Sequence, residues 1–146
     1  AVQIDVPPVL RSGAIRAADI KAAVADLHRH QPLRSRTGAV HGAAWVCGGK
    51  IVRLFEDVGR HNALDKLLGH GAQAGMDWQQ GFVLISSRAS YEMVAKAAML
   101  GIGCVVAVSA PTALAARLAE QAGITLVGFA RPGQCSIYSQ PQLVAY

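Results

Sequence analysis

The stretch FVLISSRASYEMVAKAAMLGIGCVVAVSAPTALAARLAEQAGITLVGFA, residues 82–130, decides the fold. It contains three apolar runs without a charged residue: 82–86 (FVLIS), 104–108 (CVVAV) and 125–130 (TLVGFA). Between them, residues 91–100 and 112–122 have helical length, and Gly101 and Gly123 follow as helix ends. Continuous apolar strands that alternate with ten-residue helices predict a parallel sheet covered on both faces.

Upstream of this stretch, residues 43–47 and 50–56 flank Gly48-Gly49, which predicts a β-hairpin. Apolar spacing predicts helices at 15–30 and from 61 to about 71, the second ending at Gly69 or Gly71. Pro111 suits the first position of the helix that follows it. Residues 1–13 should be an extended lead-in, 31–40 a loop, and 136–139 a short edge strand.

Composition limits the class of protein. The chain has 146 residues, 52% hydrophobic and 16% charged, which favours a single α/β domain over residues 1–146 rather than a disordered segment. A chain that begins with Ala1 is expected to be a processed protein or a fragment. No apolar run reaches the length of a membrane span, so we expect no membrane association.

Charge and cysteines narrow the partners and the compartment. The net charge is +5, but the basic residues form no run and no nucleic-acid-binding signature occurs, so we expect no nucleic acid partner. Dispersed arginines fit a compact phosphorylated ligand, although surface solubility explains the total charge equally well. Three widely spaced cysteines, without a Cys-x-x-Cys pair or a signal peptide, favour a reducing, cytoplasmic location.

Ligands of open α/β sheets bind outside the carboxyl ends of the strands. That rule selects four turns: 56–62 (EDVGRHN), 86–90 (SSRAS), 109–112 (SAPT) and 130–134 (ARPGQ). SAPT favours a structural role, because a Pro-containing turn is common between a strand and a helix. The other three turns are candidate parts of a ligand site.

The SSRAS turn opens a helix, where free N–H groups and the helix dipole favour an anion. Ser86, Ser87 and Ser90 offer hydroxyls and Arg88 a guanidinium; simple capping would explain Ser90 but not Arg88. In the ARPGQ turn, Arg131 precedes a rigid Pro-Gly pair. The N–H groups of the next two residues could form an anion nest, or the segment could be a plain β-turn.

The EDVGRHN turn gathers many polar groups in an otherwise apolar chain. Its candidates are Glu56, Asp57, Arg60, His61, Asn62 and, nearby, Asp65. They could contact a ligand, act as acid and base, or pair with one another in a structural cluster. A lone histidine such as His41 is more often structural than a ligand.

Five blocks in order resemble the FdhD family of formate dehydrogenase accessory sulfurtransferases. They are TGAVHGAAW, EDVGRHNALDKLLG, SSRASYEMVAKAAMLGI, VSAPTALA and TLVGFARPGQ, covering about residues 37–139. The second and third are long and specific. The resemblance implies a three-layer α/β/α sandwich with a mixed, mostly parallel sheet, like that of the cytidine deaminases.

The resemblance also implies a function. Family members take persulfide sulfur from a cysteine desulfurase and pass it to the molybdenum bis(molybdopterin guanine dinucleotide) cofactor of formate dehydrogenase. The residues expected to bind that cofactor, or GDP as its mimic, are His41, Arg60, His61, Asn62, Ser86, Ser87, Arg88, Ser90, Phe129, Ala130, Arg131, Pro132, Gly133 and Gln134. The pseudo-symmetric shape of this cofactor favours a homodimer.

Two departures shape the expectation. The family's sulfur-carrying Cys-x-x-Cys loop is missing, so the chain should be the C-terminal domain, without a catalytic cysteine. His41 is followed by Gly42 and Ala43 rather than by the Glu of a zinc deaminase, so no zinc is expected. The alternatives are a nucleotide hydrolase that uses Glu56, Asp57 and His61 as acid and base, and a non-catalytic assembly module.

Overall fold

The computed structural model describes residues 15–29, 40–131 and 134–145. Six strands form the central sheet in the spatial order β3-β2-β4-β5-β6-β7. They are β2 (His41–Cys47), β3 (Lys50–Asp57), β4 (Phe82–Ile85), β5 (Cys104–Ala107), β6 (Thr125–Gly128) and β7 (Ser136–Ser139). Two further short strands, β1 (Ile15–Arg16) and β8 (Val144–Ala145), pair with each other in parallel.

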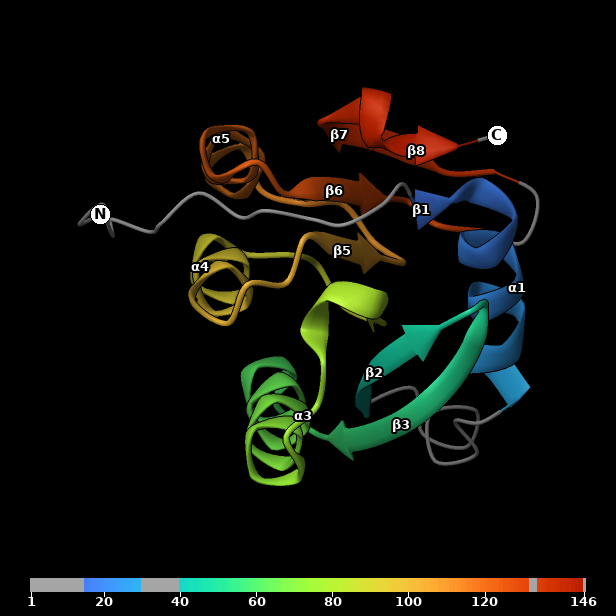
Figure 1. Ribbon diagram of the computed structural model, residues 1–146, viewed down its shortest axis with the longest axis vertical. Helices are drawn as coiled ribbons and strands as arrows, with labels where there is room; N and C mark the ends of the chain where they lie inside the picture. Colours follow the sequence, from blue (N-terminus) through green and yellow to red (C-terminus); the bar gives the residue numbers. More distant parts are fainter. Residues whose placement is uncertain (1–14, 30–39, 132–133, 146) are drawn as a thin grey trace.

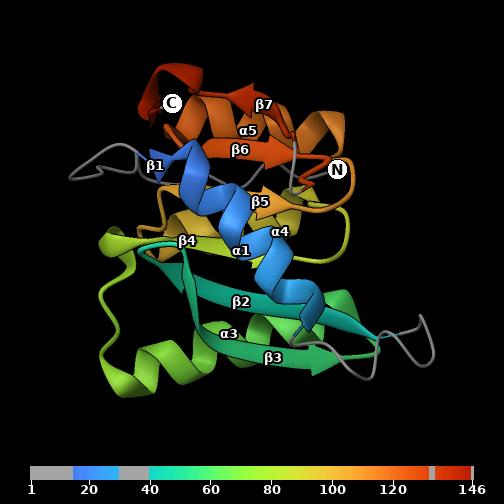
Figure 2. The same ribbon diagram turned by 90° about the vertical axis from the view of Figure 1, so that its right-hand side faces the viewer.

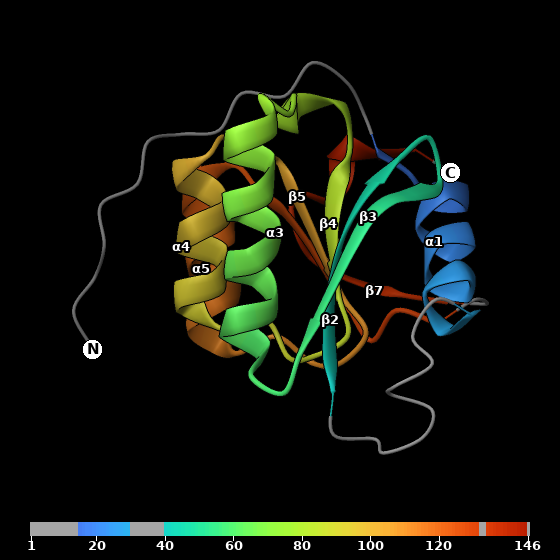
Figure 3. The ribbon, with the colours of Figure 1, turned by 90° about the horizontal axis from the view of Figure 1, so that it is seen from below.

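Helices cover both faces of this sheet. On one face lie α3 (Arg60–Ala74), α4 (Tyr91–Met99) and α5 (Ala113–Ala122), and on the other lies α1 (Ala17–Arg29). Figure 3 shows the resulting three layers edge-on, and Figure 1 shows the same helices on either side of the strands. The predicted three-layer α/β/α architecture is therefore confirmed.

Strand direction places the carboxyl ends of four strands on one edge. β4, β5 and β6 are parallel, whereas β2 is antiparallel to both β3 and β4, and β7 is antiparallel to β6. Thus β3, β4, β5 and β6 point one way, and the arrowheads of β3, β5 and β6 share one side of Figure 2. The sheet is mixed, as predicted, but three of its five strand pairings are antiparallel, so it is not mostly parallel. His41 at the start of β2 reaches the same edge.

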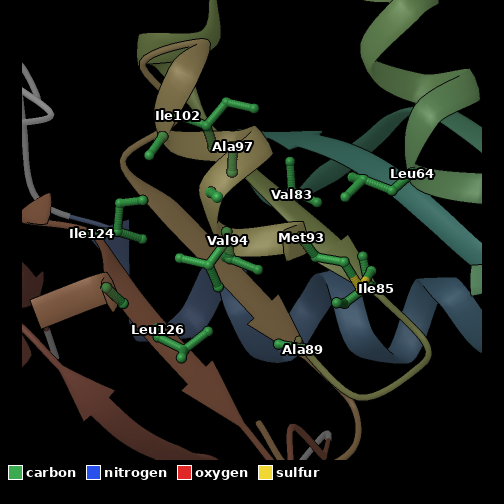
Figure 4. Close-up of a cluster of buried hydrophobic side chains, with 14 of the residues drawn as sticks. Leu64, Val83, Ile85, Ala89, Met93, Val94, Ala97, Ile102, Ile124 and Leu126 are labelled. Atoms are coloured by element: carbon green, nitrogen blue, oxygen red, sulfur yellow. The ribbon is translucent and has the colours of Figure 1, made fainter. Parts of the chain in front are cut away.

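The strands alternate their side chains between two hydrophobic cores. Figure 4 shows part of the core under α3, α4 and α5, where Ile85 and Leu126 meet Met93 and Val94 of α4. The opposite core, under α1, contains the intervening strand residues together with Ile20 and its helix neighbours. Because β4, β5 and β6 are buried on both faces, their sequences show no polar alternation.

Helix α3 is longer than its glycines suggest. It continues through Gly69 and Gly71 to Ala74 and ends at Gly75, which adopts the left-handed conformation of a C-cap (φ 66°). Gly71 stays helical because Trp78 packs directly against it, and a Cβ there would lie 2.2 Å from the indole ring. The expected stop at Gly69 or Gly71 is therefore wrong, because tertiary packing overrides the local preference of glycine.

Other boundaries differ by a few residues. The first helix begins at Ala17, not residue 15, because Ile15 and Arg16 pair with β8. Pro111 precedes the N-cap Thr112, whose hydroxyl accepts from the Ala115 N–H, so proline is not the first helical residue. The predicted lead-in 1–13 and the loop residues 31–39 lie outside the described residues. The hairpin and the edge strand 136–139 form as predicted.

Candidate ligand-binding site

A pocket of about 420 Å³ opens at the sheet edge where the four carboxyl ends meet. Its walls come from every turn that the sequence selected and from the start of β2. The lining residues are His41, Arg60, Ser86, Ser87, Arg88, Val108, Ser109, Phe129 and Arg131. The volume lies within the range of small-molecule sites, roughly 300–1,000 Å³.

Backbone hydrogen bonds join the turns around the pocket. The Thr112 N–H donates to the Ala89 carbonyl over 3.0 Å, which ties the third turn to the SSRAS turn. The Phe129 N–H donates to the Ser109 carbonyl over 3.2 Å, which ties the last turn to the third. The walls are therefore fixed to one another by the main chain, as a preorganised site requires.

Ser86 sits at the fork where β2 and β4 separate. Its N–H donates to the Gly42 carbonyl over 3.0 Å, while the Gly42 N–H donates to the Ser86 hydroxyl over 2.7 Å. The hydroxyl thus takes the place that the Ser86 carbonyl would have in a continuing antiparallel ladder. The chain can leave the sheet here, and the start of β2, with His41, remains held beside it.

The remaining serines of the SSRAS turn have separate tasks. The Ser87 hydroxyl donates to the Arg88 carbonyl over 3.2 Å. Ser90 is the N-cap of α4, where its hydroxyl accepts from the Met93 N–H, and it does not line the pocket. The capping interpretation therefore holds for Ser90, while Arg88 is exposed and faces the pocket.

Arg131 is anchored to the main chain beside the pocket. Its Nη1 donates to the Val108 carbonyl over 2.7 Å and to the Ala130 carbonyl over 3.2 Å. One side of the guanidinium fork therefore braces the carboxyl ends of β5 and β6. The rest of the fork is available to a ligand, because its nitrogens make no other hydrogen bond or ion pair among the described residues.

Phe129 follows β6 in a conformation that is rare for an aromatic residue. Its φ of 51° is left-handed, and 42% of its surface is exposed. The strand consequently ends at Gly128, two residues before the predicted end. Such backbone strain costs about 1 kcal/mol or more and is typical of functional sites.

One residue of the EDVGRHN turn lines the pocket, and others form a hydrogen-bonded clasp around Asp57. Arg60 lines the pocket, but Asp57 bonds to Lys66 Nζ over 2.7 Å and to the Gly59 N–H over 2.9 Å. Asn62 also reaches Asp57, with Nδ2 3.5 Å from the carboxylate. The Lys66 hydrogen bond, followed by the Gly59 N–H, lowers the pKa of Asp57 from 3.8 to about 2. This clasp fixes the start of α3 and hence Arg60.

The pocket concentrates unpaired positive charge. Three arginines and one histidine line it, and no lining residue carries a carboxylate. Within the described ranges, no ion pair involves Arg60, Arg88 or Arg131, although Lys66 and Lys96 are paired with aspartates. A site with this charge favours an anion that offers several oxygens.

Seven of the fourteen residues expected to bind the cofactor line the pocket: His41, Arg60, Ser86, Ser87, Arg88, Phe129 and Arg131. His61, Asn62, Ser90, Ala130 and Gln134 are not among the lining residues, and Pro132 and Gly133 lie outside the described residues. The Gln134 N–H donates to the Arg131 carbonyl over 3.3 Å, so it is not available to an anion nest.

Sequence reasoning gave little weight to two lining residues, Val108 and Ser109. The signal for Ser109 was its position directly after a buried strand, which it shares with the SSRAS turn. A neighbouring proline made the SAPT turn look purely structural. Only the fold shows that this turn forms the pocket wall between the SSRAS and ARPGQ turns.

The cysteines lie away from the pocket. Cys104 is fully buried, Cys135 is partly buried, and Cys47 is exposed, but none lines the pocket. Cys47 ends β2, whereas His41 begins it, and six residues of strand span roughly 20 Å. Among the described residues, no three His, Cys, Asp or Glu side chains form a group that could hold a metal ion. None of the described helices is long and apolar enough to cross a membrane.

Comparison with a solved structure places this fold. A crystal structure from Desulfotalea psychrophila, of a protein provisionally assigned as a formate dehydrogenase accessory protein, aligns with a TM-score of 0.89 and 30% identity. The alignment covers 97% of this chain and 59% of that chain. The expected likeness to cytidine deaminases stays a prediction.

Comparison of sequences gives closer relatives. The "Sulfur carrier protein FdhD" of Xanthomonas campestris pv. campestris (strain B100) is 54% identical over 139 residues, which are 94% of this chain and 50% of that protein. The protein of the same name from Cupriavidus necator (strain H16) is 54% identical over 138 residues, 93% of this chain and 48% of its own length. The chain thus spans about half the length of these curated relatives. A model of the FdhD/NarQ family matches residues 2–145, and the chain belongs to that family.

Proposed function

We propose that this chain is the cofactor-binding part of a formate dehydrogenase accessory sulfur carrier. The complete protein would take persulfide sulfur from a cysteine desulfurase and pass it to the molybdenum bis(molybdopterin guanine dinucleotide) cofactor, which this domain binds for delivery to formate dehydrogenase. The observation that carries the proposal is the pocket with three guanidinium groups and no carboxylate. The names of the curated relatives and of the aligned crystal structure support the wider role.

The chemistry of the pocket fits one nucleotide arm of that cofactor. Planar guanidinium forks bind phosphate oxygens in pairs, and Arg60, Arg88 and Arg131 stand on three different walls. Phe129 adds an exposed aromatic ring against which a planar base could pack. A volume of about 420 Å³ suits a nucleotide rather than the whole bis-dinucleotide. Two such sites in a homodimer would match the pseudo-symmetry of the ligand, and light scattering would test that.

Sulfur transfer requires a part of the protein other than this domain. A nucleophilic cysteine must be accessible and ionisable, and the one exposed thiol among the described residues, Cys47, is at the other end of β2 from the pocket. We therefore expect this chain to bind cofactor without completing sulfur transfer. Incubation with a cysteine desulfurase and labelled cysteine checks this, because accumulation of persulfide on the chain would contradict it.

Calorimetry with GDP, GMP and guanosine tests the binding proposal. We expect GDP to bind most tightly and guanosine least, because the charge of the pocket is directed at phosphate. Arg131→Ala should weaken GDP binding by about tenfold or more. Arg117→Ala, which removes an exposed arginine that does not line the pocket, should leave it unchanged. Equal affinities for GDP and guanosine, or unchanged GDP affinity in Arg131→Ala, would refute this assignment.

The two alternatives have separate outcomes. A hydrolase that used Asp57 as an acid at neutral pH would need a raised pKa, but its pKa is about 2 and its oxygens face Lys66 and Gly59. Guanosine phosphates incubated with the chain should therefore stay intact. A pure assembly module would bind desulfurase or dehydrogenase but no nucleotide, which a ligand-free pulldown beside the calorimetry would show. We also propose a cytoplasmic location, because thiols stay reduced in that compartment.

A further inference from the structure

One buried hydroxyl that lines the pocket carries a proton for which the described residues offer no hydrogen-bond acceptor. Ser86 is only 5% exposed and lines the pocket, and its oxygen already accepts from the Gly42 N–H over 2.7 Å. Within residues 15–29, 40–131 and 134–145, the Ser86 hydroxyl donates to no acceptor. A buried donor that stays unpaired costs about 1–3 kcal/mol, so a native protein normally provides it with a partner.

The neighbouring backbone has the same property. The N–H groups of Ser87, Arg88 and Ala89 bond to no acceptor in the described part of the chain, although Ser87 and Ala89 are buried. The SSRAS turn therefore holds several hydrogen-bond donors that lack acceptors among the described residues, and three arginines line the same pocket. A ligand that satisfies all of them must present acceptor oxygens only, as an oxyanion does.

We infer that Ser86 is the positioning and selectivity residue of this pocket, donating its hydroxyl proton to an anionic oxygen of the bound ligand. The inference rests on the proposed function, since it assumes a phosphate-bearing ligand, and it adds the residue that fixes one oxygen. The oxygen of Ser86 is held in place by Gly42, so its proton can rotate only toward the remaining free side. The hydrogen bond from the Gly42 N–H to the Ser86 hydroxyl also keeps the adjacent His41 at the pocket wall.

Ser139 supplies a matched control. It is also a buried serine, 2% exposed, but it ends β7 and does not line the pocket. Its hydroxyl accepts from the Leu126 N–H over 2.9 Å and donates to the Ile124 carbonyl over 2.6 Å. Replacing either serine with alanine removes one buried hydroxyl. Only the Ser86 change removes a proton that a ligand would otherwise receive.

Titration with inorganic pyrophosphate tests the inference without the guanosine part of the ligand. Ser86→Ala removes a hydrogen bond to a charged group. It should therefore weaken pyrophosphate binding about 10- to 100-fold, which corresponds to about 1.4–2.8 kcal/mol of binding free energy. Ser139→Ala should change it less than about threefold. Equal losses in the two variants, or no loss in Ser86→Ala, would overturn the inference.

Because Ser86→Ala also leaves the Gly42 N–H unpaired, the variant could fold poorly, and the wild-type chain provides a second readout. When its proton engages an anion, the Ser86 oxygen becomes a stronger acceptor, so the Gly42 amide proton should move downfield as pyrophosphate saturates. An unchanged Gly42 resonance at saturation overturns the inference.

The outcomes for the two proposals are distinguishable. If pyrophosphate binds through Ser86 but guanosine adds nothing to affinity, the inference stands and the guanine nucleotide assignment fails. If GDP binds and pyrophosphate does not, the pocket recognises the base, and the inference fails while the assignment survives. Binding of neither ligand overturns both.

Discussion

Replacing Gly71 with alanine should destabilise the protein, although alanine is the better helix former. Gly71 lies inside α3, where the indole of Trp78 rests directly on its Cα. A Cβ at this position would lie 2.2 Å from two ring atoms, Cη2 and Cζ2, whereas ordinary contact begins near 3.4 Å. Helix and ring must therefore separate by about 1 Å before the methyl group can fit.

The ring has little freedom to move. Trp78 is 9% exposed, and Trp45 meets it edge-to-face with the ring centroids 5.0 Å apart. Overpacking of such a contact costs about 1–3 kcal/mol. Alanine recovers up to about 1 kcal/mol of helix propensity and chain entropy. The net loss of unfolding free energy in Gly71→Ala should therefore be about 1–2 kcal/mol.

Gly69 provides the control on the same helix. It is exposed, and a Cβ there would meet no atom within 4 Å, so Gly69→Ala should gain about 0.5–1 kcal/mol. Urea unfolding of the two variants should therefore differ by about 1.5–3 kcal/mol, with unchanged m-values. Thermal midpoints should differ by roughly 3–12 °C, since each kcal/mol moves the midpoint of a chain of this size by about 2–4 °C.

Stability of Gly71→Ala at or above that of Gly69→Ala would refute the reasoning, because the contact with Trp78 would then not constrain α3. A lower m-value instead of a lower midpoint would mean that the denatured or native ensemble had changed in compactness. The result bears on the site, since α3 begins at Arg60 and its packing on the sheet sets where that guanidinium lies.

Three further outcomes follow from the structure. The pKa of Asp57 is lowered to about 2, so the stability that its clasp contributes is complete above the ordinary value of 3.8 and is lost as pH falls through about 2. Asp57→Asn should therefore flatten the acid-unfolding curve between these two pH values. Titration of the carboxyl group by NMR measures the pKa directly. Ser139→Ala should cost about 1–3 kcal/mol in urea unfolding, because the buried hydroxyl accepts from the Leu126 N–H over 2.9 Å and donates to a backbone carbonyl over 2.6 Å, and both groups would lose their partner. A thiol reagent should label Cys47 rapidly in the native protein and Cys104 only after unfolding, and equal rates would contradict the burial of Cys104.

Most of the secondary structure followed from the sequence because the signals are local. The runs FVLIS, CVVAV and TLVGFA lack polar alternation, and only strands covered on both faces tolerate that pattern. Thr112, Ser90 and Gly123 act as helix caps through their own backbone and side-chain geometry. The edge of the sheet that carries the pocket could be named in advance, since parallel strands share one carboxyl edge.

Glycine shows where local reasoning failed. Gly69, Gly71 and Gly75 occur within seven residues, and the sequence predicted a helix end at Gly69 or Gly71. The helix continues to Gly75 because Trp78, which follows α3 in the chain, folds back onto Gly71. A contact made only in the folded protein therefore decides where α3 ends.

The sequence by itself determined the α/β class, the order of the strands along the chain and the four turns that could carry a site, because periodicity and turn chemistry act over a few residues. Only the tertiary structure decided which polar groups share the pocket. From the sequence, Asp57 was as good a candidate for the site as Arg60, but Lys66 of α3 bonds to its carboxylate, and Asp57 does not line the pocket. Likewise, Ser86, Ser87 and Ser90 look alike in sequence. The Ser87 hydroxyl donates to a carbonyl, whereas the Ser86 and Ser90 hydroxyls accept from backbone N–H groups, and of these two only Ser86 lines the pocket.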